Sequence, residues 1–312
     1  MVPFLRWAGG KRWLAKELAP LLRDRISNRY FEPFLGSGAM FFALEPRCAV
    51  LSDINSELID TYRAVAEEPV RLVRRLKDLS VDAETYYRLR AWEPKTLNDR
   101  ALRFIYLNRT CYGGLYRTNR QGRFNVPFGG GERTPEILWR ERLIEKASRL
   151  LQQPGVELWA CDFEAIMEEA AEGDVVYCDP VYTTANFEQF DRYNPRIFSW
   201  SEQERLRGAA CRAWERGALV IVSNVYAKDI RKLYPDTFRI KLMRKKSIGN
   251  AAKPHKTGQE YLIILDPESR PDYWKPLGRI ERQLPGRGSL RRKHLSFLPG
   301  SSGELRIRAK TR

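Results

Sequence analysis

The sequence predicts an α/β fold: a mostly parallel sheet with an antiparallel closing strand, plus a smaller, mostly helical unit. Strand-like apolar runs alternate with helix-length amphipathic segments along most of the chain, and this alternation is typical of a mostly parallel sheet. Only a polar loop separates the last two strand-like runs, so we expect them to pair antiparallel. Residues 67–149 break the alternation with a helical pattern rich in arginine and aromatic residues.

Seven runs, several of them bounded by Gly, Pro, Asp or Asn, are predicted to be strands. In chain order they are residues 29–33, 49–54, 156–162, 174–180, 218–224, 238–245 and 260–266. Five segments between them are predicted to be helices, at residues 11–22, 56–66, 163–171, 201–216 and 227–233. Ser201, followed by Glu204 three residues later, is the predicted N-cap of the fourth helix.

These elements divide the chain into three predicted parts. Residues 1–66 and 150–268 are expected to form one discontinuous core, and residues 67–149 an insert that contains a glycine-rich β-hairpin. Residues 269–312 are rich in Pro, Gly, Ser and Arg and offer little apolar surface to bury. We therefore expect them to be a basic, disordered tail.

The composition argues against membrane, secreted and metal-binding proteins. No run approaches the roughly 20 apolar residues that a bilayer span needs, and the first residues lack a signal-peptide pattern. We therefore expect a cytoplasmic, nucleoid-associated protein. The 5 cysteines are scattered without a C-x-x-C pair and there are 2 histidines, so we expect reduced thiols and no metal.

The charge balance points to a polyanionic partner. The net charge is +16, and residues 270–312 contain 12 Lys or Arg against 3 acidic residues, so that segment carries +9 and the rest +7. A charge of this size predicts attraction to nucleic acid. A basic surface that serves only solubility is the alternative for the body of the chain.

A first motif predicts a nucleotide-like ligand. Residues 32–38 read Glu-Pro-Phe-Leu-Gly-Ser-Gly, a strand running into a small-residue turn before an apolar helix, and glycines there let backbone N–H groups approach a ligand. Alone, this pattern also fits a plain tight turn. Asp53 ends the next predicted strand, where a carboxylate accepts hydrogen bonds from ribose hydroxyls.

A second motif is Asp179-Pro180-Val181-Tyr182, which follows an apolar strand. Pro180 favours an extended backbone at Asp179 and removes one N–H, so carbonyl oxygens near the carboxylate are left to accept hydrogen bonds. With the ring of Tyr182, this is a site for a planar amine. The alternative is an Asp-Pro turn with Tyr182 packed in the core.

A third pattern lies in the insert, where arginines and aromatic residues alternate around glycines. Guanidinium groups suit phosphates and guanine edges, and aromatic rings suit base stacking. The alternative is a solvated arginine-rich loop over an aromatic core. The residues are Arg103, Arg109, Arg117, Arg120, Arg123 and Arg133, with Phe104, Tyr106, Tyr112, Tyr116, Phe124 and Phe128.

From residue 3 to residue 266 the sequence resembles the Dam-type (D12 class) DNA adenine-N6 methyltransferases. The matching motifs, in chain order, are residues 6–11, 32–38, 53–55, 107–117, 124–129, 162–163 and 179–182. The resemblance implies a Rossmann-like methyltransferase sheet with a DNA-recognition domain. It also implies methyl transfer from S-adenosyl-L-methionine to N6 of a flipped adenine in double-stranded DNA, within GATC or a related short site.

The resemblance implies roles for the cofactor residues. Gly36, Ser37 and Gly38 would cradle the methionine part, Asp53 would accept from the ribose, and Asp162 and Phe163 would hold the adenine. Trp7, Gly10 and Lys11 would complete the pocket near the amino-acid end. The implied set is Trp7, Gly10, Lys11, Phe34, Gly36, Ser37, Gly38, Asp53, Ile54, Asp162, Phe163 and Asp179.

Catalysis would rest on Asp179, Pro180 and Tyr182. The adenine amine is a poor nucleophile because its lone pair is delocalised into the ring, so Asp179 and the Pro180 carbonyl would accept its two protons and direct the lone pair at the methyl group. Tyr182 would stack on the flipped base. Val181 stands where the family usually has a second proline, which predicts slower chemistry.

For DNA, the resemblance implies that Arg117 reads a guanine, that Leu115 and Pro127 contact bases by shape, and that Tyr112 wedges beside the flipped adenine. Gly113 replaces a polar amide common in the family, which leaves the site sequence open. The implied DNA-binding set is Arg109, Tyr112, Leu115, Arg117, Asn119, Arg123, Asn125 and Pro127. We expect a monomer, and a cognate restriction endonuclease as partner stays open.

Two other functions stay open at this point. A related sheet with a similar tetrapeptide can methylate cytosine N4 or a protein glutamine, although the arginine-rich insert disfavours a protein substrate. Val181 could also mark a catalytically impaired site in a DNA-binding module, although Asp53, Asp162, Asp179 and Tyr182 are all present.

Overall fold

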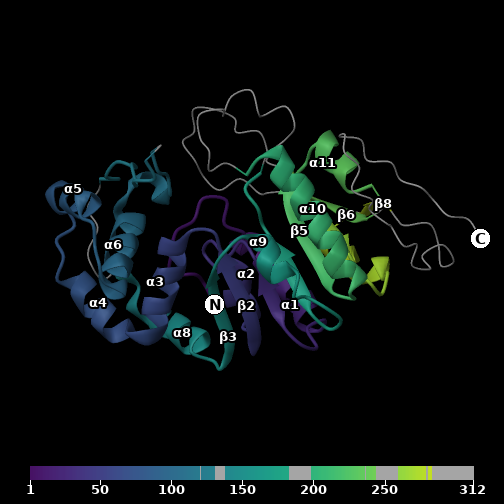
Figure 1. Ribbon diagram of the computed structural model, residues 1–312, viewed down its shortest axis with the longest axis horizontal. Helices are drawn as coiled ribbons and strands as arrows, with labels where there is room; N and C mark the ends of the chain where they lie inside the picture. The colour runs from purple at the N-terminus through teal and green to yellow at the C-terminus, as the bar shows by residue number, and fades with distance from the viewer. Residues whose placement is uncertain are drawn as a thin grey trace, which may run out of the picture.

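The computed structural model describes residues 1–119, 121–130, 138–182, 198–235, 237–243, 259–278 and 280–282. Within these ranges one sheet has the strand order β3-β2-β1-β4-β5-β7-β6-β8, with helices on both faces (Figure 1). The strands are β1 (Tyr30–Glu32), β2 (Cys48–Asp53), β3 (Gly155–Ala160), β4 (Val175–Cys178), β5 (Leu219–Val225), β6 (Phe238–Met243), β7 (Gln259–Leu265) and β8 (Ile280–Arg282).

The predicted fold class is confirmed. Strands β3, β2, β1, β4 and β5 pair in parallel, and β7 pairs antiparallel with both β5 and β6. Strand β7 therefore inserts between its two neighbours. Strand β1 has β2 on one side and β4 on the other, and a ligand crevice forms at such a switch point, outside the carboxyl ends of the strands.

Two apolar clusters fill the two faces of the sheet. Side chains alternate between faces along a strand, so Leu51 of β2 joins the cluster of α1 and α3, while Val50 joins that of α9 and α10. The helices around the sheet are α1 (Arg12–Arg23), α2 (Ala39–Leu44), α3 (Ser56–Glu67), α8 (Glu141–Leu151), α9 (Phe163–Met167), α10 (Trp200–Glu215) and α11 (Lys228–Leu233).

The insert is mostly helical, as its sequence pattern predicts. Its helices α4 (Pro69–Lys77), α5 (Ala83–Ala91) and α6 (Leu97–Thr110) lie to one side of the sheet (Figure 1). Helix α6 packs along α3 and is buried over most of its length. Because α3 follows β2 directly, this packing ties the insert to the carboxyl edge of the sheet.

Two local predictions were wrong. Ser199, rather than Ser201, caps α10, and its side chain accepts a hydrogen bond from the N–H of Glu202. The same Ser-x-x-Glu pattern therefore applies two residues earlier. Of the predicted helices, residues 163–171 form a shorter element, α9, which ends at Met167.

The predicted tail is also ordered over its first part. Residues 271–277 form the 3₁₀ helix η3 (Pro271–Leu277), and β8 joins the sheet beside β6. Trp274 is fully buried, and its indole N–H donates to Asp266, which also pairs with Arg25 at 2.8 Å. One large aromatic residue thus anchors a segment that is otherwise poor in apolar residues. Residues 283–312 lie outside the described residues.

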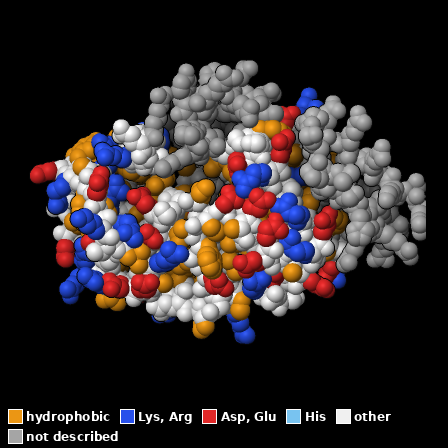
Figure 2. Space-filling model, viewed as in Figure 1, with side chains coloured by type: hydrophobic (Ala, Val, Ile, Leu, Met, Phe, Trp, Pro, Cys, Tyr) orange, Lys and Arg blue, Asp and Glu red, His pale blue; other side chains and the backbone are white. Residues whose placement is uncertain are grey.

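No helix in the described part of the chain is long and apolar enough to cross a membrane. Lys and Arg side chains are interspersed with Asp and Glu over the described surface visible in Figure 2. On this face the basic excess does not gather into one patch.

Candidate active site

The loop between β1 and α2 is shaped by glycine. Gly36 (φ +45°) and Gly38 (φ +65°) lie in the left-handed region that favours glycine, and a Cβ at Gly36 would lie 2.8 Å from the indole nitrogen of Trp7. The N–H of Gly36 donates to Asp53 at 3.0 Å, and the hydroxyl of Tyr62 donates to its carbonyl at 2.9 Å. The end of β2 and helix α3 therefore both hold this loop in place.

Beneath the loop lies a buried carboxyl group, Glu32. It accepts hydrogen bonds from the hydroxyl of Tyr30 at 2.8 Å and from the N–H of Phe41 at 2.9 Å. Burial raises the pKa of Glu32 to about 8, because an apolar environment disfavours the ionised form. This residue supports the loop from inside the protein.

Asp53 sits at the carboxyl end of β2, as predicted. One carboxylate oxygen accepts from Gly36 and the other from the N–H of Asn55 at 3.0 Å, while burial raises the pKa of Asp53. Carboxylate oxygens have further lone pairs, so both can still accept from a ligand. The next side chain, Ile54, is 79% exposed, and so presents an apolar surface beside this acceptor.

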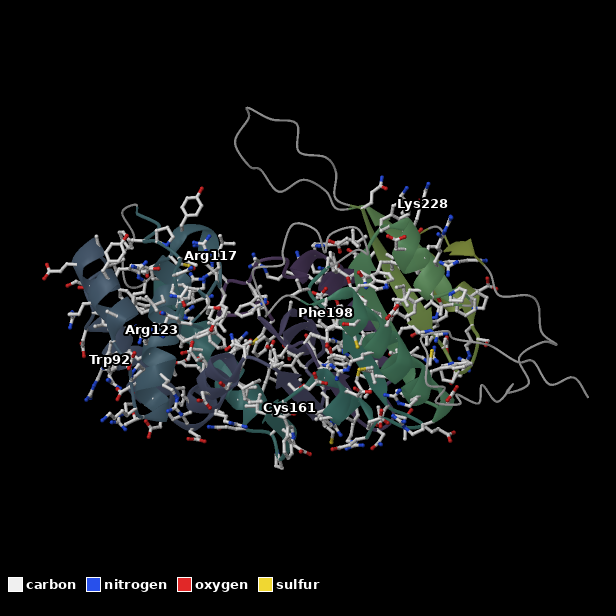
Figure 3. The ribbon with its side chains drawn as sticks, turned by 45° about the horizontal axis from the view of Figure 1, so that its top comes forward. Trp92, Arg117, Arg123, Cys161, Phe198 and Lys228 are labelled. Carbon is white, nitrogen blue, oxygen red and sulfur yellow. The ribbon has the colours of Figure 1, made fainter. Side chains whose placement is uncertain are left out.

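Three aromatic side chains pack together beside the loop that follows β1. The rings of Phe34 and Phe163 stack with centroids 5.3 Å apart, and Phe198 packs against both. Arg205 lies over Phe163 and pairs with Asp162 at 2.8 Å. Figure 3 labels Phe198 and also Cys161, the residue before Asp162. The structure thus brings Phe34, Asp162 and Phe163 together.

Asp179 follows β4 directly and pairs with Lys11. The ammonium of Lys11 is 3.0 Å from Asp179 and 3.6 Å from Glu260, and it donates to the Gly9 carbonyl at 3.0 Å. Burial raises the pKa of Asp179 to about 6, although Lys11 acts in the opposite direction. The predicted pocket residue Lys11 therefore lies at the tetrapeptide.

The ring of Tyr182 is held at the same place. Its hydroxyl lies 2.8 Å from the hydroxyl of Ser223 and donates to Glu260 at 3.0 Å. The Lys11 ammonium is 4.6 Å from the ring centroid. Pro180 is buried and Val181 is 63% exposed, so the tetrapeptide passes from the interior to the surface between these two residues.

Sequence reasoning missed two residues of this site, Ser223 and Glu260. Each is a polar side chain inside an apolar strand, β5 and β7 respectively, and both are buried. A charged residue in an otherwise apolar buried strand is unusual, and this was the available signal. What they contact depends on strand pairing across the sheet, which the linear sequence does not state.

The described residues 111–119 and 121–129 pair antiparallel, as expected for the two arms of the predicted hairpin. Backbone hydrogen bonds join Tyr112 to Pro127, Arg117 to Asn125 and Asn119 to Arg123. Tyr112 is 63% exposed, and Leu115, Arg117 and Pro127 are exposed as well. These predicted DNA-contacting side chains therefore share an accessible element.

The polar residues of the hairpin have defined partners. The guanidinium of Arg117 donates to the side chain of Asn125 at 2.8 Å, and that of Arg123 pairs with Glu93 at 3.4 Å. Arg117 and Arg123 are labelled on the insert in Figure 3. Asn119 accepts from two backbone N–H groups of the turn, so its side chain shapes the tip of the hairpin.

Two of the arginines expected on this surface lie elsewhere. Arg109 is buried, and its Nε donates to the Leu138 carbonyl at 2.7 Å. Arg103 is also buried and donates to the carbonyls of Leu89 and Arg90. Both hold helix α6 against its neighbours because their donors satisfy buried carbonyl groups. Arg120 and Arg133 lie outside the described residues.

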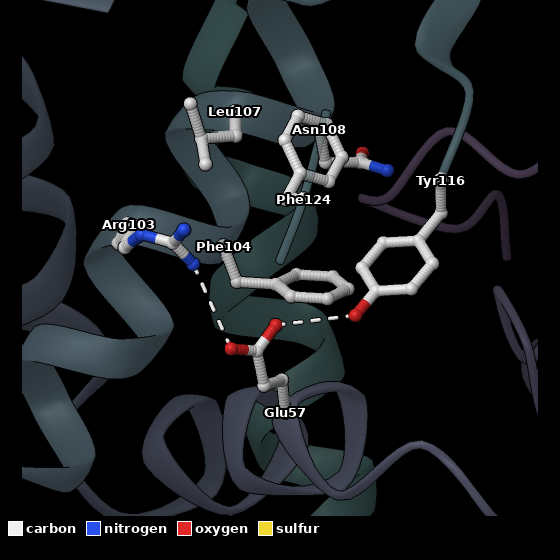
Figure 4. Close-up of a pocket in the computed structure, with 7 residues that line it drawn as sticks. All are labelled: Glu57, Arg103, Phe104, Leu107, Asn108, Tyr116 and Phe124. Atoms are coloured by element: carbon white, nitrogen blue, oxygen red, sulfur yellow. Dashed lines mark hydrogen bonds and ion pairs between the residues drawn. The ribbon is translucent and has the colours of Figure 1, made fainter. Parts of the chain in front are cut away.

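The hairpin packs on α6 and on the first turn of α3 around a small pocket (Figure 4). Glu57 in the first turn of α3 accepts a hydrogen bond from the hydroxyl of Tyr116 at 3.2 Å and pairs with Arg103 at 3.6 Å. The side chain of Asn108 bonds both backbone polar groups of Arg6. The remaining lining residues are Phe104, Leu107 and Phe124.

Among the described residues, no group of three or more His, Cys, Asp or Glu side chains is arranged to hold a metal ion. The cysteines in these ranges are unpaired thiols.

Comparisons with known proteins agree with this geometry. Residues 7–248 match the family model of the D12 class N6 adenine-specific DNA methyltransferases. The chain is 35% identical over 272 residues to the Type II methyltransferase M1.LlaDCHI of Lactococcus lactis subsp. cremoris, covering 84% of this chain and 94% of that protein. It is 32% identical over 276 residues to the DNA adenine methylase of Escherichia coli (strain K12), covering 85% and 95%. The chain belongs to the D12 class N6 adenine-specific DNA methyltransferase family.

Proposed function

We propose that this protein transfers the methyl group of S-adenosyl-L-methionine to N6 of a flipped adenine in duplex DNA, within GATC or a related short site, and that it acts as a monomer. One observation carries the proposal: the glycine loop after β1 and the Asp179 tetrapeptide after β4 follow adjacent parallel strands. A cofactor and an amine that bound these two segments would therefore be neighbours.

The described residues fit the cofactor. Gly36 and Gly38 let the loop pack closely on Trp7 and Phe42. Asp53 can accept from ribose hydroxyls, and the exposed Ile54 offers apolar surface to a ring. Asp162 and Phe163 would hold the adenine. When bound, S-adenosylmethionine supplies a methyl group on a positively charged sulfur.

Asp179 and the Pro180 carbonyl would orient the substrate amine. By accepting hydrogen bonds from its two N–H groups, the carboxylate and the carbonyl would take the nitrogen lone pair out of conjugation with the ring. A pKa of about 6 keeps Asp179 mostly ionised at neutral pH, which is the form that accepts a hydrogen bond from the amine and, later, a proton. Activity should therefore fall as the pH drops through about 6.

Tyr182 would stack on the flipped base, and the hairpin would read the flanking sequence. The hydrogen bonds from its hydroxyl fix the Tyr182 ring at the crevice, so stacking requires little rearrangement. Arg117, positioned by Asn125, would face a guanine edge. Tyr112, Leu115 and Pro127 are exposed beside it.

The experiment is to incubate the purified full chain with unmethylated plasmid and methyl-tritiated S-adenosylmethionine, then to map N6-methyladenine by sequencing. We expect tritium in DNA and modified adenines within one short site. Asp179→Asn should reduce transfer by roughly 10³-fold, because removing a group that stabilises the transition state costs on this order. Tritium that stays off DNA, or full activity of Asp179→Asn, refutes the proposal.

A further inference from the structure

Three charged side chains meet beside the tetrapeptide, and all come from different parts of the chain. Lys11 precedes α1, Asp179 follows β4, and Glu260 lies on β7. The Lys11 side chain is 5% exposed and that of Glu260 8%. With two carboxylates around one ammonium, the cluster carries one net negative charge when all three groups are ionised.

Methyl transfer places a positive charge on the substrate amine, which would lie beside this cluster. The sulfur–carbon bond breaks with its electron pair going to sulfur, and the new carbon–nitrogen bond uses the lone pair of N6. The substrate nitrogen is then cationic until one of its protons passes to the Asp179 carboxylate and on to solvent. Lys11 alone would neutralise Asp179 and leave no net charge to stabilise this cation.

We propose, on the basis of the methyl transfer proposed above, that Glu260 is a positioning residue that keeps the Lys11–Asp179–Glu260 cluster at one net negative charge and thereby stabilises the positive charge developing on the substrate amine. Glu260 shares the Lys11 ammonium with Asp179, at 3.6 Å against 3.0 Å. It therefore leaves the catalytic carboxylate able to serve as a hydrogen-bond acceptor.

Glu260 also accepts a hydrogen bond from the Tyr182 hydroxyl. The charge of Glu260 and its effect on the position of the Tyr182 ring must therefore be tested separately. Gln at position 260 removes the charge and keeps an oxygen acceptor for that hydroxyl. Ser223→Ala removes the other partner of the hydroxyl and keeps all three charges. These two substitutions form a matched pair.

Glu260→Gln and Ser223→Ala should also shift the acid limb of the pH–activity profile in opposite directions. Among the described residues, the titratable or hydrogen-bonding groups that act on or near Asp179 are Lys11, Glu260, Ser223, Tyr177, Cys178, Tyr182 and Glu32. Glu260 raises the pKa of Asp179, whereas Lys11 and Ser223 lower it. Losing the Glu260 charge should therefore lower the pKa of Asp179, and losing the Ser223 hydroxyl should raise it.

The test compares the full-length wild type, Glu260→Gln, Ser223→Ala and the exposed control Glu215→Gln, on a duplex containing the mapped site. We expect Glu260→Gln to lose roughly 10²-fold in kcat, with KM changed less than about threefold and the acid limb moved to lower pH. Ser223→Ala should move that limb to higher pH, and Glu215→Gln should match the wild type.

The fluorescence of 2-aminopurine in the DNA distinguishes an effect on the methyl-transfer step from an effect on binding of the flipped base. With 2-aminopurine at the target position and no cofactor, Glu260→Gln should reach the wild-type fluorescence, because the charge acts on the transition state. A kcat within about threefold of wild type, an acid limb that moves the same way as in Ser223→Ala, or lost 2-aminopurine fluorescence overturns the inference.

Two further variants keep the test decisive if Glu260→Gln does not fold, which a thermal melt would show. Glu260→Asp keeps the charge and should retain kcat to within about tenfold. The double variant Lys11→Gln, Glu260→Gln leaves Asp179 as the one charged group of the cluster, so the net charge stays at minus one. Its kcat should therefore be higher than that of either single variant. Failure of either expectation in folded protein overturns the inference. A wild type that methylates no DNA refutes the proposed function instead.

Discussion

Tyr116 of the hairpin and Trp7 of the amino-terminal loop are stacked, with ring centroids 5.8 Å apart and ring planes 19° from parallel. Trp7 packs against Gly36 of the cofactor loop, and the Tyr116 hydroxyl bonds Glu57, four residues after Asp53. A single hairpin residue thus connects to both loops of the proposed cofactor site. Sites that share one packed element can be coupled, and the coupling acts equally in both directions.

We therefore predict that Tyr116→Ala weakens the mutual enhancement of cofactor and DNA binding by roughly tenfold, a typical size for such coupling. Calorimetry would measure cofactor affinity with and without the duplex. Tyr87→Ala, an exposed aromatic residue on α5, is the control. An unchanged ratio of the two affinities in Tyr116→Ala would show that the stack carries no coupling.

Val181→Pro should speed methyl transfer. A proline after Pro180 restricts its backbone toward the extended region, which stiffens the carbonyl proposed to accept the substrate amine. Val181 is exposed, so a proline ring meets little obstruction from packing. Single-turnover rates of wild type and variant give the comparison, and a rate that does not rise removes the support for this idea.

Arg117→Ala should lose discrimination at one base pair, by about 1–3 kcal/mol if the guanidinium reads a guanine edge. Competition between the mapped duplex and duplexes with single substitutions would measure this. Arg71→Ala on α4 is the matched control because Arg71 is exposed, lies outside the predicted DNA-binding residues and pairs with Glu68. An equal loss on all duplexes would mark Arg117 as a phosphate contact.

Truncation should separate the anchored segment from the rest of the carboxyl terminus. Trp274→Ala should destabilise the protein by about 3–5 kcal/mol, because it empties a fully buried aromatic site. Residues 283–312 hold 8 Lys or Arg and 1 acidic residue, so their deletion should reduce the salt dependence of DNA binding and preserve the methylated site. Denaturant unfolding measures the stability of Trp274→Ala. DNA binding at several salt concentrations measures the effect of the deletion.

Glu32 should make stability depend on pH. Its folded-state pKa is raised to about 8, so the native state binds a proton more tightly than the unfolded chain and stability falls as the pH rises from about 4.5 toward about 8. Glu32→Gln should flatten this part of the curve. Thermal melts across that range would decide, and parallel curves for wild type and variant would contradict the assignment.

The sequence was most informative where local pattern and chemistry coincide. Asp53 and Asp179 end apolar strands, so their place at the carboxyl edge of the sheet could be predicted from alternation alone. Arg103 and Arg109 could not be placed, because their charge suggested solvent while their donors reach carbonyls far along the chain. Glu260 and Trp274 were missed for the same reason: their partners, Lys11 and Asp266, are set by tertiary packing.

The pairing of Lys11 with Glu260 has a consequence for biosynthesis. These residues stand near opposite ends of the described chain, so a nascent polypeptide cannot bring them together until β7 has emerged from the ribosome. Domains of this kind complete their packing only when all the strands are available. The Lys11–Glu260 pair is therefore among the last contacts of the molecule to form, and an interrupted translation product would lack it.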